Sequence, residues 1–125
     1  MQIRIEYRFT SLNDYIDAER IHRQRAAVIK RDETRVAHFS AISAGRIDAY
    51  PVQVIFHWHR QDSRTDPDNI AFGEKFVLDG LVKAGVLRND GWKEIGGISH
   101  TFALADDDYV IVEIESLSRY KVDGE

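Results

Sequence analysis

Three carboxylates and a lysine lie close together in the sequence between Thr65 and Trp92. Asp66 and Asp68 are two residues apart, with Pro67 between them. A proline biases the residue before it toward extended backbone, and residues i and i+2 of extended backbone project to the same side. These two carboxylates are therefore expected to reach one cation together. Hard cations such as Mg²⁺ prefer oxygen ligands, and one or two carboxylates usually hold them together with water and substrate phosphate.

The residues that follow have a helical pattern. Asp68 or Asn69 is a suitable N-cap, and Gly85 is a suitable residue just beyond the C-terminus. At about 100° per residue, Lys75 and Asp79 fall on the same edge of a helical wheel as Asp68. Helical side chains lean toward the N-terminus, so the ammonium of Lys75 is expected to approach the aspartates. The opposite arc is apolar and predicts a buried face, formed by Ile70, Ala71, Val77, Leu78, Leu81, Val82 and Ala84.

Each of these features also has a simpler interpretation. D-P-D-N is a common turn and cap sequence. Lys75 and Asp79 are spaced as an ordinary surface pair on a helix, and Asp90 precedes a glycine as the first residue of a turn does. Taken jointly, the carboxylates and the lysine favour a metal-dependent phosphodiesterase.

The same residues resemble the signature of the RusA-type Holliday-junction resolvases. The matching elements are D-P-D-N at 66–69, Lys75 four residues before Asp79, K-A-G at 83–85 and N-D at 89–90. The segment SLNDYIDAER at 11–20 is similar to phage-type members, and the resemblance covers most of residues 1–115. It implies that Asp66, Asp68 and Asp90 bind the metal and that Lys75 is catalytic. The chain departs from the family in two places: the gap before Lys75 is about three residues longer, and Asn89 replaces the first aspartate of a pair.

The resemblance implies a Mg²⁺-dependent endonuclease, with Mn²⁺ as a possible substitute, that nicks four-way DNA junctions in recombination and repair. It also implies a homodimer, because a C₂ pair matches the two-fold symmetry of a junction, and it implies no organic cofactor. Lys75 could stabilise developing charge or position water, and both roles stay open. Two other functions remain: a junction- or DNA-binding module without catalysis, and a D-x-D metal-dependent nucleotide phosphatase or transferase, although the chain lacks a glycine-rich phosphate loop.

The most basic stretch of the chain runs from Arg20 to Arg35. Clustered arginines and lysines typically contact the phosphate backbone, although a solvated helix face is the simpler interpretation. A polar loop expected at 60–65 adds two more arginines. The residues proposed to contact DNA are Arg20, Arg23, Arg25, Lys30, Arg31, Arg60 and Arg64.

Length and composition indicate one domain of 125 residues without disulfides, because the chain has no cysteine. The net charge of −4 does not suit a DNA-binding protein, but its distribution does. Residues 1–65 contain 11 Lys/Arg and 8 Asp/Glu, whereas residues 66–125 contain 6 and 13. The basic half could contact phosphates, and a cation would offset charge in the acidic half.

The periodicities predict an α/β (α+β) domain at 1–115, followed by a flexible tail at 116–125. Residues 2–9, 52–59, 93–104 and 109–115 are expected as strands. One helix is expected to run from about 11 to the late thirties, with a break near 30–33, and another over about 68–84. The order β-α-β-α-β-β predicts a single mixed sheet of about four strands covered by two helices. Residues 106–108 are expected to form a hairpin turn.

Two further sequence features concern metal and location. His57 and His59 project to one side of a predicted strand, which suggests zinc only weakly because no third ligand lies nearby. No apolar run is long enough to span a bilayer, and the alternating N-terminal segment does not resemble a signal peptide. A cytoplasmic protein with no membrane partner is expected, in a bacterium or a phage-infected host.

Overall fold

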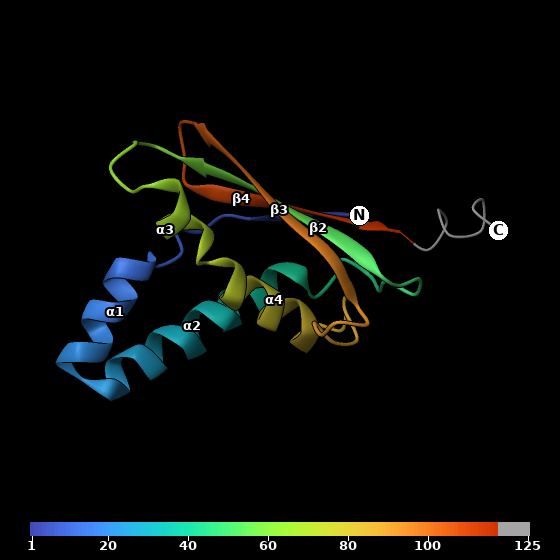
Figure 1. The fold of residues 1–125 in the computed structure, drawn as a ribbon, viewed down its shortest axis with the longest axis horizontal. Helices are drawn as coiled ribbons and strands as arrows, with labels where there is room; N and C mark the ends of the chain where they lie inside the picture. The colour runs from blue at the N-terminus through green and yellow to red at the C-terminus, as the bar shows by residue number, and fades with distance from the viewer. Residues whose placement is uncertain (118–125) are drawn as a thin grey trace.

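The computed structural model describes residues 1–117 and shows one four-stranded sheet with every described helix on the same face (Figure 1). The strands are β1 (Gln2–Ile5), β2 (Val52–Arg60), β3 (Ile95–Leu104) and β4 (Tyr109–Ser116), in the spatial order β1-β4-β2-β3. The sheet is mixed, since β3 pairs parallel with β2 while β4 pairs antiparallel with β1 and β2. The predicted fold class is confirmed.

Each of the two predicted helices is divided into two segments. The helices are α1 (Leu12–Ile21), α2 (Arg23–Ala41), α3 (Pro67–Ala71) and α4 (Glu74–Lys83). The first break is at His22, where the backbone is extended, and not near residues 30–33 as predicted. The second break, at Phe72–Gly73, was not predicted. With each pair counted as one helical region, the predicted order β-α-β-α-β-β is confirmed.

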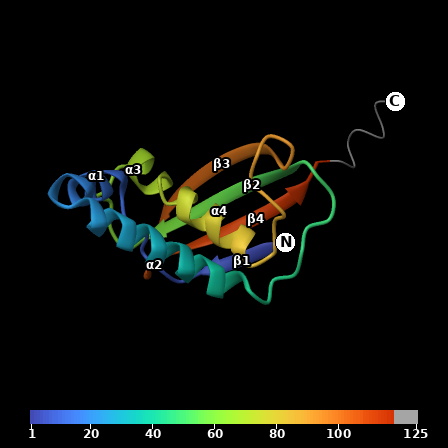
Figure 2. The same ribbon diagram turned by 90° about the horizontal axis from the view of Figure 1, so that it is seen from below.

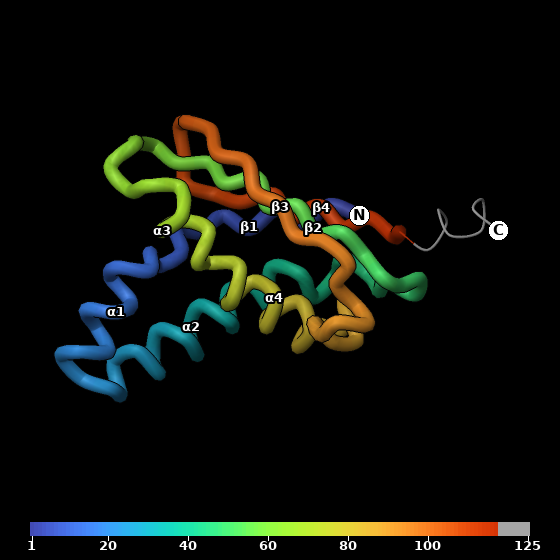
Figure 3. The backbone as a smooth tube through the Cα atoms, in the orientation of Figure 1, coloured from blue at the N-terminus to red at the C-terminus, as the bar shows by residue number. Residues whose placement is uncertain are grey.

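Strand β2 lies between β3 and β4, which follow one another in sequence but do not pair. The predicted hairpin turn at 106–108 is therefore wrong, and this segment passes across the end of β2. Gln61 holds it there, because its backbone N–H donates to Asp108 at 2.9 Å and its side-chain amide donates to the carbonyl of Asp106 at 2.7 Å. As a result, the loop after β2 and the β3–β4 connection lie at the same end of the sheet (Figure 3).

The alternating pattern of β2 explains how the sheet is covered. Val52, Val54, Phe56 and Trp58 are buried, while the residues between them are only partly buried. The buried set faces the helices, which lie across one side of the sheet (Figure 2). Helix α4 contributes Phe76, Val77 and Leu81 to the same core, so the hydrophobic layer lies between the sheet and the helices.

A buried carboxylate ties α2 to the segment that follows β1. Glu33 accepts hydrogen bonds from the backbone N–H of Thr10 at 2.8 Å, from the Thr10 hydroxyl, and from the hydroxyl of Tyr7 at 3.2 Å. Burial raises the pKa of Tyr7, and the charge of Glu33 raises it further. These hydrogen bonds satisfy a carboxylate that would otherwise be costly to bury.

Part of the predicted tail belongs to the domain. Ser116 is the last residue of β4, and residues 118–125 lie outside the described part of the chain. Among the described residues, no helix combines the length and apolarity that crossing a membrane requires.

Helices α2 and α4 cross closely at Gly80. A Cβ atom built on Gly80 would overlap the Cβ of Ala37 and would lie 2.8 Å from the carbonyl oxygen of Thr34 and 2.8 Å from the backbone nitrogen of His38. Two of these three neighbours are backbone atoms, which cannot rotate away. The glycine therefore allows the two helices to approach each other.

We expect Gly80→Ala to lower the free energy of unfolding by about 1–3 kcal/mol, the usual cost of overpacking. In an open helix the same change would raise stability by up to about 1 kcal/mol, because alanine has the higher helix propensity. Denaturant unfolding measures the sign directly. Gly91→Ala is the control, since a Cβ there meets only a side-chain oxygen of Glu94 at 3.5 Å. Equal or greater stability of Gly80→Ala would show that α2 moves aside easily.

Candidate functional site

The two aspartates of the D-P-D-N segment lie at the start of α3. Asp66 is the N-cap residue, with extended backbone (φ −67°, ψ 150°) and no side-chain capping bond, and Pro67 follows it as the first helical residue. Asp68 lies in the first turn, so only Asp66 is extended. The prediction that both carboxylates project to one side of extended backbone is therefore wrong. It required extended backbone up to Asp68, whereas the helix already begins at Pro67.

Both carboxylates are exposed, and neither takes part in an ion pair among the described residues. Within residues 1–117, Asp68 accepts hydrogen bonds only from its neighbour Asn69, from the backbone N–H at 2.9 Å and from the side-chain amide at 3.3 Å. The side-chain oxygen of Asn69 in turn accepts from the backbone N–H of Asn13 at 3.0 Å, which anchors α3 to the start of α1. Carboxylate oxygens that are open to solvent in this way suit a hard, hydrated cation.

Lys75 and Asp90 line one groove beside α4, although they are 15 residues apart in sequence. Glu74, Lys30 of α2 and Tyr15 of α1 also line it. The ammonium of Lys75 lies 3.8 Å from Asp79, and its side chain is 58% exposed. After α4, Gly85 adopts a positive φ of 81° and ends the helix as predicted. The buried Val86 and Leu87 then lead the chain to Asp90.

Asp66 lines a different cavity, which shares no lining residue with the groove beside α4. Within residues 1–117, no three His, Cys, Asp or Glu side chains are grouped closely enough to hold a metal ion. The structure thus brings together Lys75 and Asp90, but it does not gather all four predicted residues around one point.

The break between α3 and α4 explains this separation. A Cβ on Gly73 would lie 2.9 Å from the ring of Trp58 and 3.0 Å from the Cβ of Phe9, so the chain packs directly against the core there. This contact lies where α3 ends and α4 begins. A single helical wheel from Asp68 to Asp79 is therefore wrong, and Lys75 shares a helix with Asp79 but not with Asp68.

Most residues of the predicted DNA-contact set are exposed. Arg20 lies in the last turn of α1, whereas Arg23, Arg25, Lys30 and Arg31 lie on α2. Lys30 lines the groove that contains Lys75 and Asp90, and it also lines a neighbouring groove with Asp79 and Asp90. The basic helix therefore borders part of the predicted catalytic set. Arg64 is exposed in the loop after β2.

Arg60 differs from the prediction. It is the last residue of β2, not a loop residue, and it is only 5% exposed. Its guanidinium donates one hydrogen bond, to the carbonyl of Phe9 at 3.3 Å. The nearby carboxylates of Asp108 and Asp62 pair with Arg8 instead, at 3.2 and 4.0 Å. Burial lowers the pKa of Arg60, and the charge of Arg8 lowers it further, whereas Asp108 and Asp62 raise it.

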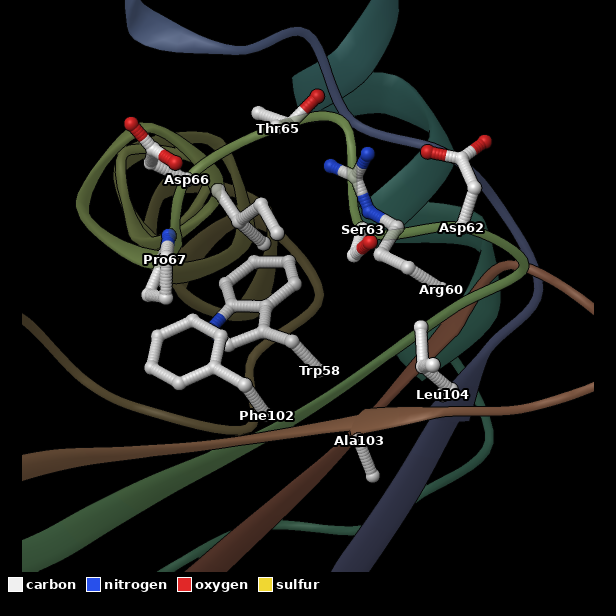
Figure 4. Close-up of a pocket in the computed structure, with 11 residues that line it drawn as sticks. Trp58, Arg60, Asp62, Ser63, Thr65, Asp66, Pro67, Phe102, Ala103 and Leu104 are labelled. Atoms are coloured by element: carbon white, nitrogen blue, oxygen red, sulfur yellow. The ribbon is translucent and has the colours of Figure 1, made fainter.

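Trp58, Phe102 and Leu104 were not predicted as site residues. They line the cavity next to Asp66 together with Arg60, as Figure 4 shows. The signal for Trp58 is the alternation of β2, since Trp58 and Arg60 are two residues apart and share one face. The two residues of β3 are placed by strand register, because Phe102 is the partner of Trp58 and Leu104 is the partner of Arg60.

His57 and His59 lie on the face of the sheet that no described helix covers. His57 contacts the hydroxyl of Thr101 at 2.7 Å and the carboxylate of Glu113 at 3.0 Å. His59 stacks on Tyr109 with ring centroids 4.2 Å apart. Each ring thus has its own neighbours within the sheet, and this does not favour the weak zinc interpretation.

The chain matches no family model and no curated protein.

Proposed function

We propose that this protein is a Mg²⁺-dependent, structure-specific endonuclease that nicks four-way DNA junctions by phosphodiester hydrolysis. The observation that supports this most directly is the groove beside α4. It places Lys75 and Asp90, two of the four residues proposed for catalysis, beside Lys30 of the basic helix. A nuclease needs such an arrangement, in which groups that act on a phosphate adjoin groups that hold the DNA backbone.

Asp66, Asp68 and Asp90 are the residues proposed to hold Mg²⁺ or Mn²⁺. Asp66 and Asp68 are both exposed at the start of α3, and one carboxylate with water and substrate phosphate is sufficient for such an ion, although residues 1–117 group no three acidic or histidine side chains around one point. Asp90 is proposed as the third ligand from the resemblance to RusA-type resolvases. When bound, the ion would offset charge on the phosphoryl oxygens and lower the pKa of a bound water.

Lys75 is proposed to act on the substrate phosphate. Its ammonium is exposed and is held only loosely by Asp79, so it remains free to approach an anionic substrate. It would either stabilise the negative charge that develops on the phosphate or position the attacking water. A preorganised cation at such a point acts most strongly where water is excluded, which here requires bound DNA to cover the groove.

A homodimer is part of the proposal, because two nicks are needed to resolve a junction and a C₂ pair presents two equivalent sites. The position of β3 at one edge of the sheet supports it. Long edge strands readily pair with another chain through their free backbone groups, and β3 is 10 residues long. Sedimentation velocity measures the assembly directly.

Incubation of the protein with labelled four-way, duplex and single-stranded DNA, with Mg²⁺ and with a chelator, tests the proposed activity. Paired nicks only in the four-way substrate, and only with Mg²⁺, are the expected result. Tight junction binding without nicks would favour a binding module. Hydrolysis of small nucleotides in preference to DNA would favour a D-x-D phosphatase.

We also expect charge reversal of the basic helical region to weaken binding. Replacing Arg20, Arg23, Arg25 and Arg31 with Glu should lower junction affinity and flatten its dependence on salt. Each lost phosphate contact removes about 0.9 from the log–log slope. Binding titrations at several salt concentrations measure this slope.

The matched control for this prediction is Arg46→Glu. Arg46 is exposed, belongs to the connection between α2 and β2, and pairs with Asp48. A slope that stays unchanged in the fourfold variant would place the DNA on another surface.

A further inference from the structure

The cavity beside Asp66 combines a buried cation with an aromatic wall. Its volume is about 180 Å³, and its walls come from the ends of β2 and β3, from the loop at 62–65 and from the start of α3. Phe102 lies next to Trp58, and Leu104 lies near the base of Arg60, as Figure 4 shows. The apolar wall is thus built from two adjacent strands whose side chains face the same way.

Arg60 makes this cavity more than an apolar hollow. Burying a charge is costly unless it is paired, and buried arginines normally face a carboxylate. Arg60 has no ion-pair partner among the described residues, because Arg8 takes both nearby aspartates. Among the described residues its guanidinium donates one hydrogen bond, to a carbonyl, and its other nitrogen atoms remain accessible to solvent, because none of them is a buried atom without a partner. A guanidinium in this state is open to an anion, and its planar fork suits the oxygens of a phosphate.

The size and the aromatic wall of the cavity indicate which group would accompany the anion. Pockets for drug-sized molecules measure about 300–1,000 Å³, so this cavity holds a smaller group, such as one planar ring. Trp58 is 3% exposed and rigidly held, since its indole N–H donates to His100 at 2.9 Å. Phe102 is 40% exposed and supplies an accessible aromatic surface. Bases stack on such surfaces with little dependence on their identity.

We propose that this cavity binds one unpaired nucleotide, with its base against Phe102 and Trp58 and its phosphate on Arg60. The inference rests on the proposed function and deepens it, because it places an unstacked nucleotide of the junction next to Asp66. The bases at the exchange point of a four-way junction stay paired, but their stacking is less continuous than in a duplex, so turning one nucleotide out of the stack costs less free energy there. The pocket would thereby favour branched over linear substrates. A free nucleotide has the same chemistry, and the experiment separates the two sources.

The test uses Trp58 as a fluorescent reporter in the full chain carrying Trp92→Phe. Trp92 is 99% exposed and is the only other tryptophan. Titration with deoxyadenosine monophosphate is expected to quench Trp58, and deoxyadenosine, which lacks the phosphate, is expected to bind at least 10-fold more weakly. A duplex with one bulged nucleotide should bind more tightly than the fully paired duplex.

Two variants of β3 provide the matched comparison. Phe102→Ala should weaken nucleotide binding about 10-fold, whereas Ile98→Ala should leave it unchanged. Ile98 is exposed on the same strand and the same face, but it does not line the cavity. Arg60→Gln should abolish the preference for deoxyadenosine monophosphate over deoxyadenosine. If this variant does not fold, the comparison of these two ligands on the unsubstituted cavity still tests whether the phosphate contributes to binding.

The outcomes separate this inference from the proposed function. Junction cleavage without any quenching by nucleotide or by bulged DNA would overturn the pocket and leave the nuclease intact. Nucleotide binding without junction cleavage would support the proposed nucleotide pocket and assign it to free nucleotides. The same result would count against the proposed endonuclease activity. Equal losses in Phe102→Ala and Ile98→Ala would overturn the proposal. So would a fall in sedimenting mass for Phe102→Ala, because a second copy of the chain would then cover this wall.

Discussion

Replacing Asp68 with asparagine is expected to abolish Mg²⁺-dependent nicking of four-way junctions while leaving junction binding within a few-fold of wild type. Loss of one carboxylate weakens the proposed cation site, and removal of a single preorganised electrostatic group typically lowers kcat by roughly 10²-fold or more. Binding should persist, because the exposed arginines and Lys30 of α2 are untouched. Single-turnover cleavage and a binding titration in chelator measure the two properties separately.

The structure makes Asp68→Asn a clean substitution. The side chain is exposed, and the Oδ1 atom that accepts from the backbone N–H of Asn69 is kept in asparagine. Stability should therefore change by less than about 0.5 kcal/mol, as for most surface substitutions. Asp107→Asn, in the exposed connection between β3 and β4, is the control and should cleave normally. Cleavage by Asp68→Asn within a few-fold of wild type at limiting Mg²⁺ would remove Asp68 from the site.

Lys75→Met is expected to lower kcat by roughly 10²-fold or more, by the same reasoning about a preorganised group near the phosphate. The fold should be unaffected. The ammonium is 3.8 Å from Asp79 and its side chain is 58% exposed, and exposed pairs of this kind contribute well under 1 kcal/mol. Metal affinity should rise or stay level, because a nearby positive charge has been removed. Single-turnover rates at saturating Mg²⁺ and thermal unfolding of the same samples provide the comparison.

Asp79→Asn separates the two roles of this lysine. It removes the ion pair of Lys75 with Asp79 but keeps the ammonium beside the groove. If the pair is only structural, Lys75→Met and Asp79→Asn should behave alike. If the lysine acts on the phosphate, only Lys75→Met should lose activity. A folded Lys75→Met protein that cuts junctions at the wild-type rate would leave the proposed mechanism without its cation.

Local signals in the sequence account for most of the secondary structure. Period-two alternation located β1 and β2, although β1 ends at Ile5, earlier than the alternation suggested, and the strands β3 and β4 were also expected from the sequence. Ser11 caps α1 by accepting from the backbone N–H of Asp14 at 3.2 Å, and Gly85 ends the second helical region as expected. The glycine pair at 96–97 coincides with a register shift between β2 and β3, as is typical of glycine in a strand.

The close packing at Gly73 and the burial of Arg60 involve contacts between residues that are distant in sequence. A Cβ on Gly73, between α3 and α4, would lie within 3.0 Å of atoms of Trp58 and Phe9. Arg60 is buried because it continues the alternation of Phe56 and Trp58 by one more step, on the face that the helices cover. The alternation itself could have indicated this burial, but an arginine beside a polar loop resembles a surface residue.

Four features could be predicted from local patterns in the chain: the residues proposed for catalysis, the α/β class, the order of strands and helical regions, and the basic character of the first helical region. These follow from short-range periodicity, from capping and turn residues, and from charge. The tertiary structure alone decided which of the residues meet. Strand register and helix crossing bring together side chains more than 40 residues apart, such as Trp58 and Phe102, or Lys30 and Lys75. No local pattern encodes these pairings, because they depend on which strands become neighbours and on how closely the helices pack.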